Sequence, residues 1–189
     1  MALGHSSGEI VAAYAARAIT VREAMAAAYH RGQAALLVKE RHPELRGLMM
    51  AVGCNANEIQ RKIEILGLYE LTAACHNSPN STTVSGDEDA IDKLAAELER
   101  DGIFSRKIRV DVAYHSCRMV LVAQDYLSAI NDMAPRPCLP EAAFYSLVGK
   151  HKTTEALGPS YWVNNLVKAG ENRLYCDMKF YRISKIKLV

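Results

Sequence analysis

The sequence predicts an α/β protein in which a smaller β-α-β-β-α-β unit interrupts a larger core. Two observations predict this class. The chain opens "MALGHSSGEIVAAYAARAIT", which places a G-x-S-x-G pattern between a short apolar stub and a helical run. Strand, sharp turn and helix is the order of a nucleophile elbow. From Leu48 to Val112 the apolar spacing then switches repeatedly between period 2 and period 3.6.

The first element is the turn around Ser6. In an elbow of this kind, glycines two positions before and two after the serine avoid Cβ clashes, so we expect this need at both Gly4 and Gly8. The helix that follows would offer its amino-terminal N–H groups and positive dipole to an oxyanion. The alternative reading of the same residues is a serine-glycine helix cap.

A second helix follows. Thr20 and Glu23 fit a capping box, which predicts a helix from Ala24 to about Glu40. Pro43 ends that segment. The two helices place Ser6 at the start of a largely helical opening region.

The middle of the chain changes its pattern. We expect four strands at residues 48–52, 69–75, 81–84 and 108–112, with helices at 55–66 and from the Ser85–Glu88 start to Gly102. Residues 77–80, Asn-Ser-Pro-Asn, have turn chemistry. The order β-α-β-β-α-β predicts a ferredoxin-like split βαβ unit.

The last part returns to helix. We expect a helix at residues 119–130, a proline-rich connector through Pro135, Pro137 and Pro140, and a strand at 142–148. The expected division is a core segment at 1–47, the inserted unit at 48–112, a return to the core at 113–167 and a divergent basic tail at 168–189.

Composition narrows the functional classes. The 189 residues are 50% hydrophobic and 23% charged with a net charge of +2, which favours neither nucleic acid nor a membrane surface as partner. No apolar run approaches the roughly 20 residues of a membrane span, and no secretory signal pattern is visible at the start. Five scattered cysteines without C-x-x-C spacing indicate reduced thiols in the cytoplasm, and neither they nor the six histidines predict a metal site.

Five stretches together are similar to the malonyl-CoA:acyl-carrier-protein acyltransferase family, and in particular to acyltransferase domains of fungal highly reducing polyketide synthases. They are "GHSSGEIVAAYAA", "YHRGQAALL", "NSPNSTTVSGDEDAI", "VDVAYHSCRM" and "PSYWVNNLV". The resemblance implies a hydrolase-like core with an inserted ferredoxin-like subdomain. It also implies transfer of malonyl from coenzyme A to the phosphopantetheine thiol of an acyl carrier protein, with no bound cofactor and with other synthase domains as further candidate partners.

The resemblance implies three principal site residues. Ser6 corresponds to the acylated nucleophile and His115 to the general base and acid, which suits a side chain whose pKa lies near neutrality. Arg31 corresponds to the residue that pairs with the free carboxylate of malonate, since guanidinium supplies a bidentate fork. Taken in isolation, Arg31 would be a solvated helix residue and His115 a structural one.

Five further positions follow from the same resemblance. His5 lines the acyl pocket, and the Ser7 backbone N–H is one oxyanion donor. Tyr114 is the aromatic residue, directly before the histidine, that favours malonyl over methylmalonyl donors. Asn165 supports the histidine, and Asn77 lies near the pocket floor or is only a turn residue.

The sequence departs from the family pattern at both ends. It holds no counterpart of the family's segment before the elbow, whose G-Q-G loop supplies a second oxyanion donor, and none after Val167. We therefore expect a truncated domain, and two alternatives stay open beside the acyltransferase. One is a catalytically incompetent synthase fragment that acts as a docking piece, and the other is a serine hydrolase, against which Arg31 and the inserted unit argue.

Overall fold

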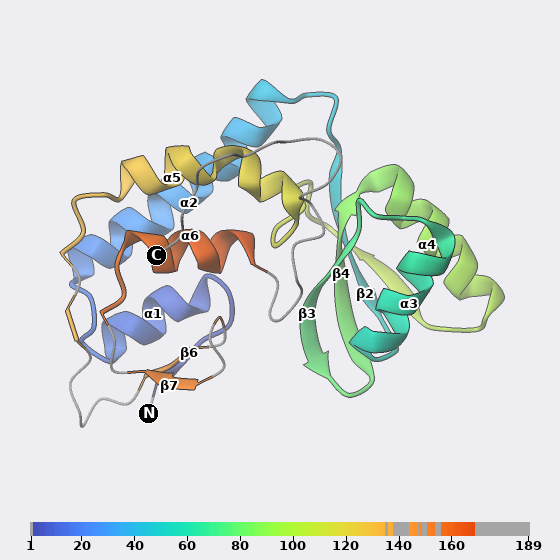
Figure 1. The fold of residues 1–189 in the computed structure, drawn as a ribbon, viewed down its shortest axis with the longest axis horizontal. Coiled ribbons are helices and arrows are strands. Elements are labelled where there is room, and N and C mark those ends of the chain that lie inside the picture. Colours follow the sequence, from blue (N-terminus) through green and yellow to red (C-terminus); the bar gives the residue numbers. More distant parts are fainter. Residues whose placement is uncertain are drawn as a thin grey trace. The chain divides into compact units, whose positions relative to one another are not determined.

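A computed structural model describes residues 2–134, 136–137, 144–146, 148, 151–153 and 156–168. The chain divides into two compact units, one of residues 1–41 with 121–167 and one of residues 42–120 with Lys168. Figure 1 labels the helices and strands of both. Each unit is described separately below.

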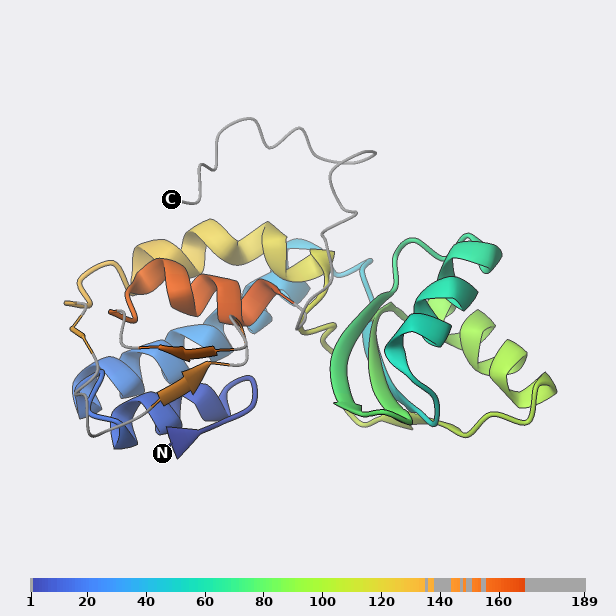
Figure 2. The same ribbon diagram turned by 60° about the horizontal axis from the view of Figure 1, so that its bottom comes forward.

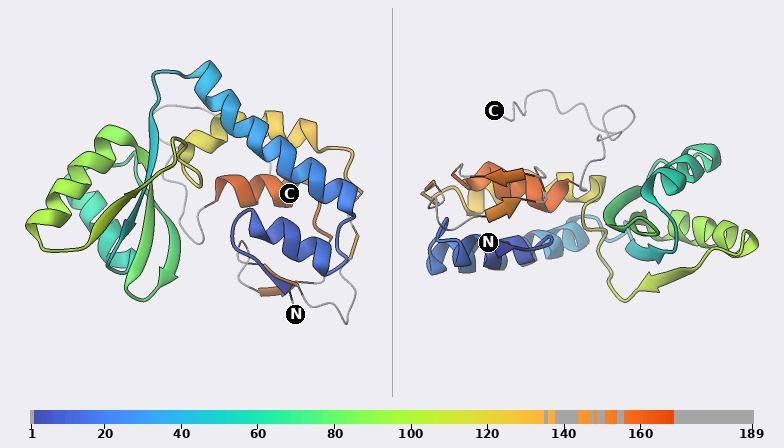
Figure 3. Two further views of the ribbon diagram at one scale, coloured as in Figure 1. Left: turned by 180° about the vertical axis from the view of Figure 1, so that it is seen from behind. Right: turned by 90° about the horizontal axis from the view of Figure 1, so that it is seen from below.

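Within its described residues, the first unit combines four helices with three short strands. Its elements are β1 (Ala2–Leu3), α1 (Gly8–Ala15), α2 (Val21–Arg41), α5 (Ala123–Ala129), β6 (Phe144–Ser146), β7 (His151–Thr153) and α6 (Pro159–Val167). Strand β1 pairs in parallel with β6, and β6 pairs antiparallel with β7, which gives the order β1-β6-β7. Helix α2 lies alongside α5 (Figure 3).

The start of α2 confirms the capping box. The Glu23 carboxylate accepts a hydrogen bond from the Thr20 backbone N–H at 2.6 Å, and the Thr20 hydroxyl accepts one from the Glu23 N–H at 3.2 Å. Both orphan donors at this helix end are therefore satisfied reciprocally. The same carboxylate also accepts from the Ala134 N–H at 3.0 Å, which ties the start of α2 to the segment after α5.

The core of the first unit is built from aromatic and small side chains. Trp162 and Phe144 are fully buried, and the Trp162 indole N–H donates to the Leu157 carbonyl at 3.0 Å. Tyr126 is also buried and donates to the Ala27 carbonyl at 3.0 Å. Alanines on α1 and α2 let these helices pack closely against the larger residues.

The second unit is a four-stranded antiparallel sheet with two helices on one of its sides (Figures 1 and 2). Its elements are β2 (Gly47–Val52), α3 (Ala56–Leu66), β3 (Thr72–Ser78), β4 (Ser81–Asp87), α4 (Glu88–Arg100), β5 (Ser105–Ile108) and the 3₁₀ helix η1 (Cys117–Val122), which runs into the first unit. The strand order is β3-β4-β2-β5.

The element order β-α-β-β-α-β agrees with the pattern predicted from the sequence, but several bounds differ. The segment 77–80 was predicted as a turn, whereas β3 continues to Ser78 and only Pro79 and Asn80 connect it to β4. Strand β4 extends to Asp87, so the helix begins at Glu88 and not at Ser85. The last strand is Ser105–Ile108, so the prediction of a strand at 108–112 was wrong.

The second unit has its own hydrophobic core. The inner faces of α3 and α4 pack against the sheet through fully buried Ile59, Ile63, Leu94 and Met50. The helices are bounded as their sequences indicate. Asn55 caps α3 by accepting from the Glu58 N–H at 2.9 Å, and Gly67 ends it with a φ of 65°.

Candidate active site

Ser6 lies at the turn between β1 and α1. Its φ is 53°, in the left-handed region that non-glycine residues rarely adopt. Hydrogen bonds from the Gly8 N–H to the His5 carbonyl (2.9 Å) and from the Glu9 N–H to the Ser6 carbonyl (3.0 Å) close the turn. A strained serine between strand and helix is the local geometry that the G-x-S-x-G pattern predicts.

The two glycines of this turn differ in whether there is room for a side chain in their place. A Cβ placed on Gly4 would meet the Gly8 carbonyl oxygen at 2.1 Å and the Glu9 nitrogen at 2.6 Å, and both are backbone atoms. A Cβ on Gly8 would meet nothing within 4 Å. The expectation is therefore confirmed for Gly4 and wrong for Gly8, because the chain folds back over one side of the turn only.

Arg31 approaches the Ser6 hydroxyl from α2. One terminal nitrogen of its guanidinium, Nη2, donates to Ser6 Oγ at 2.9 Å, and the other, Nη1, donates to Asn165 Oδ1 at 2.9 Å. The arginine is only 6% exposed. Three predicted site residues therefore lie together: Ser6 in the turn before α1, Arg31 on α2 and Asn165 on α6.

A buried carboxylate completes this cluster. Glu9, in the first turn of α1, is fully buried and accepts from Asn165 Nδ2 at 3.1 Å and from the Tyr161 hydroxyl. Asn165 Nδ2 also donates to the Ser6 carbonyl at 3.2 Å. Sequence reasoning missed Glu9 and Tyr161. Their signals are a lone acid inside an apolar helical run and a tyrosine one helical turn before Asn165.

His5 and Ser7 flank the nucleophile and are both exposed. The N–H groups of the next three residues, Gly8 to Ile10, bond to carbonyls of the turn. The roles predicted for the His5 side chain and the Ser7 N–H remain predictions.

His115 lies in the second unit on a tight loop after β5. Its φ is 58°, it is 6% exposed, and its Nδ1 lies 3.1 Å from the Lys168 carbonyl oxygen. A carbonyl can only accept, so Nδ1 carries the hydrogen and Nε2 carries the lone pair. This tautomer leaves Nε2 as the basic nitrogen. Tyr114, directly before it, is half-buried.

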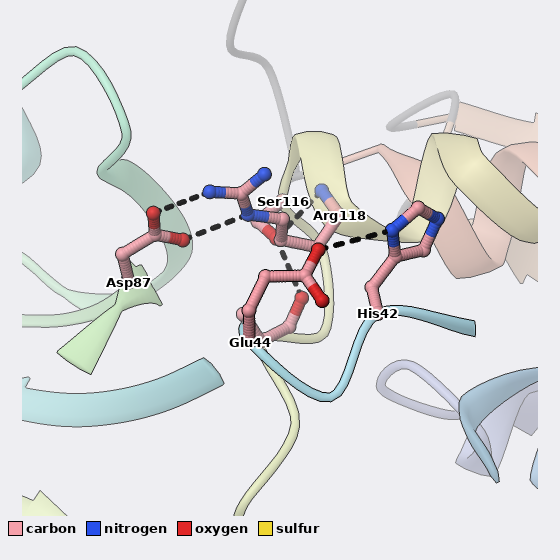
Figure 4. Close-up of polar contacts among 6 residues, drawn as sticks. His42, Glu44, Asp87, Ser116 and Arg118 are labelled. Carbon is pink, nitrogen blue, oxygen red and sulfur yellow. Dashed lines mark hydrogen bonds and ion pairs between the residues drawn. The ribbon is translucent and has the colours of Figure 1, made fainter. Parts of the chain in front are cut away.

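The loop that bears His115 is fastened to the sheet. Ser116 Oγ donates to the Ala113 carbonyl at 2.6 Å and accepts from the Arg118 N–H at 3.2 Å. The Arg118 guanidinium forms a bidentate ion pair with Asp87, with Nε 2.7 Å from Oδ1 (Figure 4). Because Asp87 joins β4 to α4, this pair ties the loop to the junction of the sheet and that helix.

Two further titratable side chains, His42 and Glu44, contact each other in the second unit. His42 Nδ1 and Glu44 Oε1 are 3.4 Å apart (Figure 4). Gly47 lies under the loop, since a Cβ there would meet the Ala113 nitrogen at 2.5 Å. Sequence reasoning did not identify Asp87, Arg118 and Gly47 as supports of the loop that bears the histidine.

Asn77 is exposed on β3, and its Nδ2 donates to Thr83 Oγ1 at 3.0 Å across the hairpin. It is a strand residue and not a turn residue. Ser6, Arg31 and Asn165 thus belong to the first unit, whereas His115, Tyr114 and Asn77 belong to the second.

The described residues hold neither a metal-ligand cluster nor a membrane-spanning helix. There, no three His, Cys, Asp or Glu side chains gather closely enough to hold a metal ion. Over the same part of the chain, every helix is too short or too polar to cross a membrane. Cys54 and Cys75 are buried thiols outside any disulfide, while Cys138 and Cys176 lie outside the described residues.

The elbow, the buried arginine and the two-unit fold define a class of protein, and residues 1–173 match the acyl transferase domain family. The chain belongs to this family. Its relatives include highly reducing polyketide synthases of Talaromyces stipitatus, 42% identical over 164 residues, and Aspergillus luteorubrus, 44% identical over 165 residues. Each match covers 87% of this chain but only 6% and 5%, respectively, of the relative.

Solved structures agree with this assignment. The acyltransferase domain from module 8 of the salinomycin polyketide synthase is 36% identical, with a TM-score of 0.80. A loading acyltransferase from the avermectin synthase is 28% identical, with a TM-score of 0.79. Each match covers 89% of this chain, and 38% and 52% of the respective solved chain. The chain is therefore an acyltransferase domain of polyketide synthase type.

Proposed function

We propose that this domain transfers a malonyl group from coenzyme A to the phosphopantetheine thiol of an acyl carrier protein through an acyl-enzyme on Ser6. The observation on which the proposal rests is the 2.9 Å contact between Arg31 Nη2 and Ser6 Oγ. A buried, permanently charged guanidinium beside a strained serine suits a donor whose acyl chain ends in a carboxylate.

Arg31 has the donors that such a substrate needs. Guanidinium has five N–H groups in one plane; Nη2 donates to Ser6 Oγ and Nη1 to Asn165 Oδ1. When the acyl group lies at Ser6, its terminal carboxylate would take over the guanidinium contact now made with Oγ. Lysine, which lacks the planar fork, would not replace this geometry.

His115 is the proposed base. Its Nε2 would accept the Ser6 proton as Oγ attacks the thioester carbonyl, and the imidazolium would return that proton to the departing coenzyme A thiolate. The second half-reaction runs in the same way with the carrier thiol as the attacking group. The action of His115 on Ser6 is itself part of this proposal.

The remaining predicted residues have supporting roles in the proposal. The Ser7 N–H, at the positive end of α1, would stabilise the oxyanion, and His5 and Asn77 would border the acyl pocket. Tyr114 would leave little room for an α-methyl group, so malonyl is favoured over methylmalonyl. One methyl group is worth only about 1–3 kcal/mol of discrimination.

We also propose how the fold is organised. The first unit, with its elbow and parallel β1-β6 pair, would be a hydrolase-like core. The second unit, with the antiparallel order β3-β4-β2-β5, would be a ferredoxin-like subdomain inserted into it.

The test is intact-mass spectrometry of the protein after brief incubation with malonyl-CoA. We expect a malonyl adduct that is absent from Ser6→Ala, strongly reduced in both Arg31→Ala and Arg31→Lys, and slow to form in His115→Ala. A folded parent protein that forms no adduct would contradict the proposal and favour a docking role. An adduct that passes to water and not to an added carrier protein would indicate a hydrolase.

A further inference from the structure

We infer that Glu9 is a positioning residue that sets the orientation of Arg31 through Asn165, and that it thereby contributes to selection of a carboxylated acyl donor. The inference rests on the proposed function and deepens it. The Glu9 side chain would act through Asn165 and would touch neither the acyl donor nor the Ser6 hydroxyl.

The first step of the argument is the burial of Glu9. Its side chain is fully buried, in a helix whose other buried residues are Ile10, Ala12 and Ala13. A carboxylate in such surroundings is unfavourable unless hydrogen bonds compensate it. Its Oε2 accepts from Asn165 Nδ2 at 3.1 Å and from the Tyr161 hydroxyl. Both donors come from successive turns of α6.

The second step is the orientation of the Asn165 amide. Its Nδ2 faces Glu9, which as a carboxylate can only accept, and its Oδ1 faces Arg31, which can only donate. The two charged neighbours therefore demand the same orientation of the amide. A neutral group in place of the Glu9 carboxylate would lose the charge-assisted bond to Nδ2 and would hold the amide less firmly, although the Ser6 carbonyl at 3.2 Å still accepts from Nδ2.

The third step extends the network to β6. The Tyr161 oxygen also lies 2.8 Å from Ser146 Oγ. A phenol has one proton, which goes to Glu9, so the Ser146 hydroxyl donates to the phenol oxygen. The resulting series of hydrogen bonds runs from Ser146 through Tyr161, Glu9 and Asn165 to Arg31, and Arg31 ends it at the Ser6 hydroxyl.

The consequence concerns the guanidinium. Arg31 is a long side chain with many rotamers, and its Nη1 donates to the Asn165 amide oxygen at 2.9 Å. Asn165 can hold it only while the amide is correctly oriented. Loss of the negative charge at Glu9 should therefore weaken carboxylate recognition at Arg31 more than it weakens acyl transfer as such.

The test compares rates of Ser6 acylation from malonyl-CoA and from acetyl-CoA, which lacks the carboxylate, for the parent protein, Glu9→Gln and Tyr161→Phe. We expect Glu9→Gln to lower the malonyl rate by about tenfold, the scale of a lost hydrogen bond to a charged group, with the acetyl rate changed by less than about twofold. Tyr161→Phe should show a smaller shift in the same direction. Glu40→Gln, the same chemical change at an exposed position of α2, should change neither rate.

A double variant separates positioning from a general structural role. If Glu9 acts through Arg31, adding Glu9→Gln to Arg31→Ala should produce no further loss of malonyl transfer. Additive losses, or equal loss from both donors in a folded Glu9→Gln protein, would overturn the inference. If Glu9→Gln does not fold, an unchanged donor ratio in Tyr161→Phe would overturn it instead. A parent that is not acylated at all would overturn the proposed function first, and this inference with it.

Discussion

At the scale of single residues, the backbone at Ser6 and His115 has unusual conformations. Both are non-glycine residues with positive φ, 53° and 58°. Such conformations cost of order 1–3 kcal/mol and persist only where the surroundings enforce them. Around Ser6 the enforcing contacts are the close approach of Gly4 to Gly8 and the hydrogen bonds of the turn. Around His115 they are the bonds of Ser116 and the Arg118–Asp87 pair.

The two glycines of the elbow offer a matched comparison. Gly4→Ala should lower the free energy of unfolding by about 3 kcal/mol or more, because its Cβ would overlap backbone that cannot move away. Gly8→Ala should leave it unchanged or raise it by up to about 1 kcal/mol, since the site is open and alanine favours helix. Chemical denaturation of both variants measures this. Equal effects would contradict the one-sided geometry of the turn.

At the scale of elements, β4 is one of the two inner strands of the sheet in the second unit. It pairs with β2 on one side and β3 on the other, and its end at Asp87 receives Arg118 from the loop that bears His115. Five of its consecutive residues, Thr82 to Gly86, are buried. Hydroxyls in such a strand require partners.

Two hydroxyls on β4 differ in this respect. Thr82 Oγ1 donates to the Cys54 carbonyl at 2.9 Å, whereas Ser85 Oγ, equally buried, has no hydrogen-bond partner among the described residues. Ser85→Ala should therefore raise the free energy of unfolding by about 1 kcal/mol, and Thr82→Val should lower it by about as much. Denaturant titrations of both variants measure these changes in the free energy of unfolding. A loss of stability in Ser85→Ala would mean that the hydroxyl is satisfied.

At the scale of the whole molecule, each unit buries an ionisable group whose pKa is strongly raised by burial. Burial raises the pKa of the Cys75 thiol in the second unit to about 11, from an ordinary value near 9. In the first unit, burial raises the pKa of the Tyr126 hydroxyl to about 12, from 10, against a smaller lowering by the charge of Arg31. Both groups favour the folded state only while they are protonated.

The stability that these two groups contribute decreases as the pH rises. Because both folded pKa values lie above the unfolded ones, these groups contribute fully below pH 9, and their contribution is lost as pH rises from about 9 to about 12. We expect the midpoint of thermal unfolding to fall over that range. Cys75→Ala should flatten the fall at its lower end and Tyr126→Phe at its upper end. An unfolding midpoint that stays constant up to pH 11 would exclude burial of the Cys75 thiol.

The sequence by itself determined the local structure and the residues of the elbow. The Thr20–Glu23 box, the Asn55 cap and the glycine ends of α3 and α4 are short-range features, because their hydrogen bonds or positive φ involve residues only a few positions apart. The last strand could not be placed in this way. Ile108, Val110 and Val112 alternate as a strand does, yet β5 pairs with β2 only from Ser105 to Ile108, and only Leu48 and Gly47 of β2 lie beyond that register.

Only the tertiary structure decided which polar side chains work together. Sequence similarity singled out Ser6, Arg31 and Asn165, but the contacts among them join residues 25 to 159 positions apart. Glu9 and Tyr161, 152 positions apart, were missed for the same reason. A lone acid inside an apolar helical run does not show which donors will meet it. Its role follows from the donors that folding brings to it, because burial without those donors would be unfavourable.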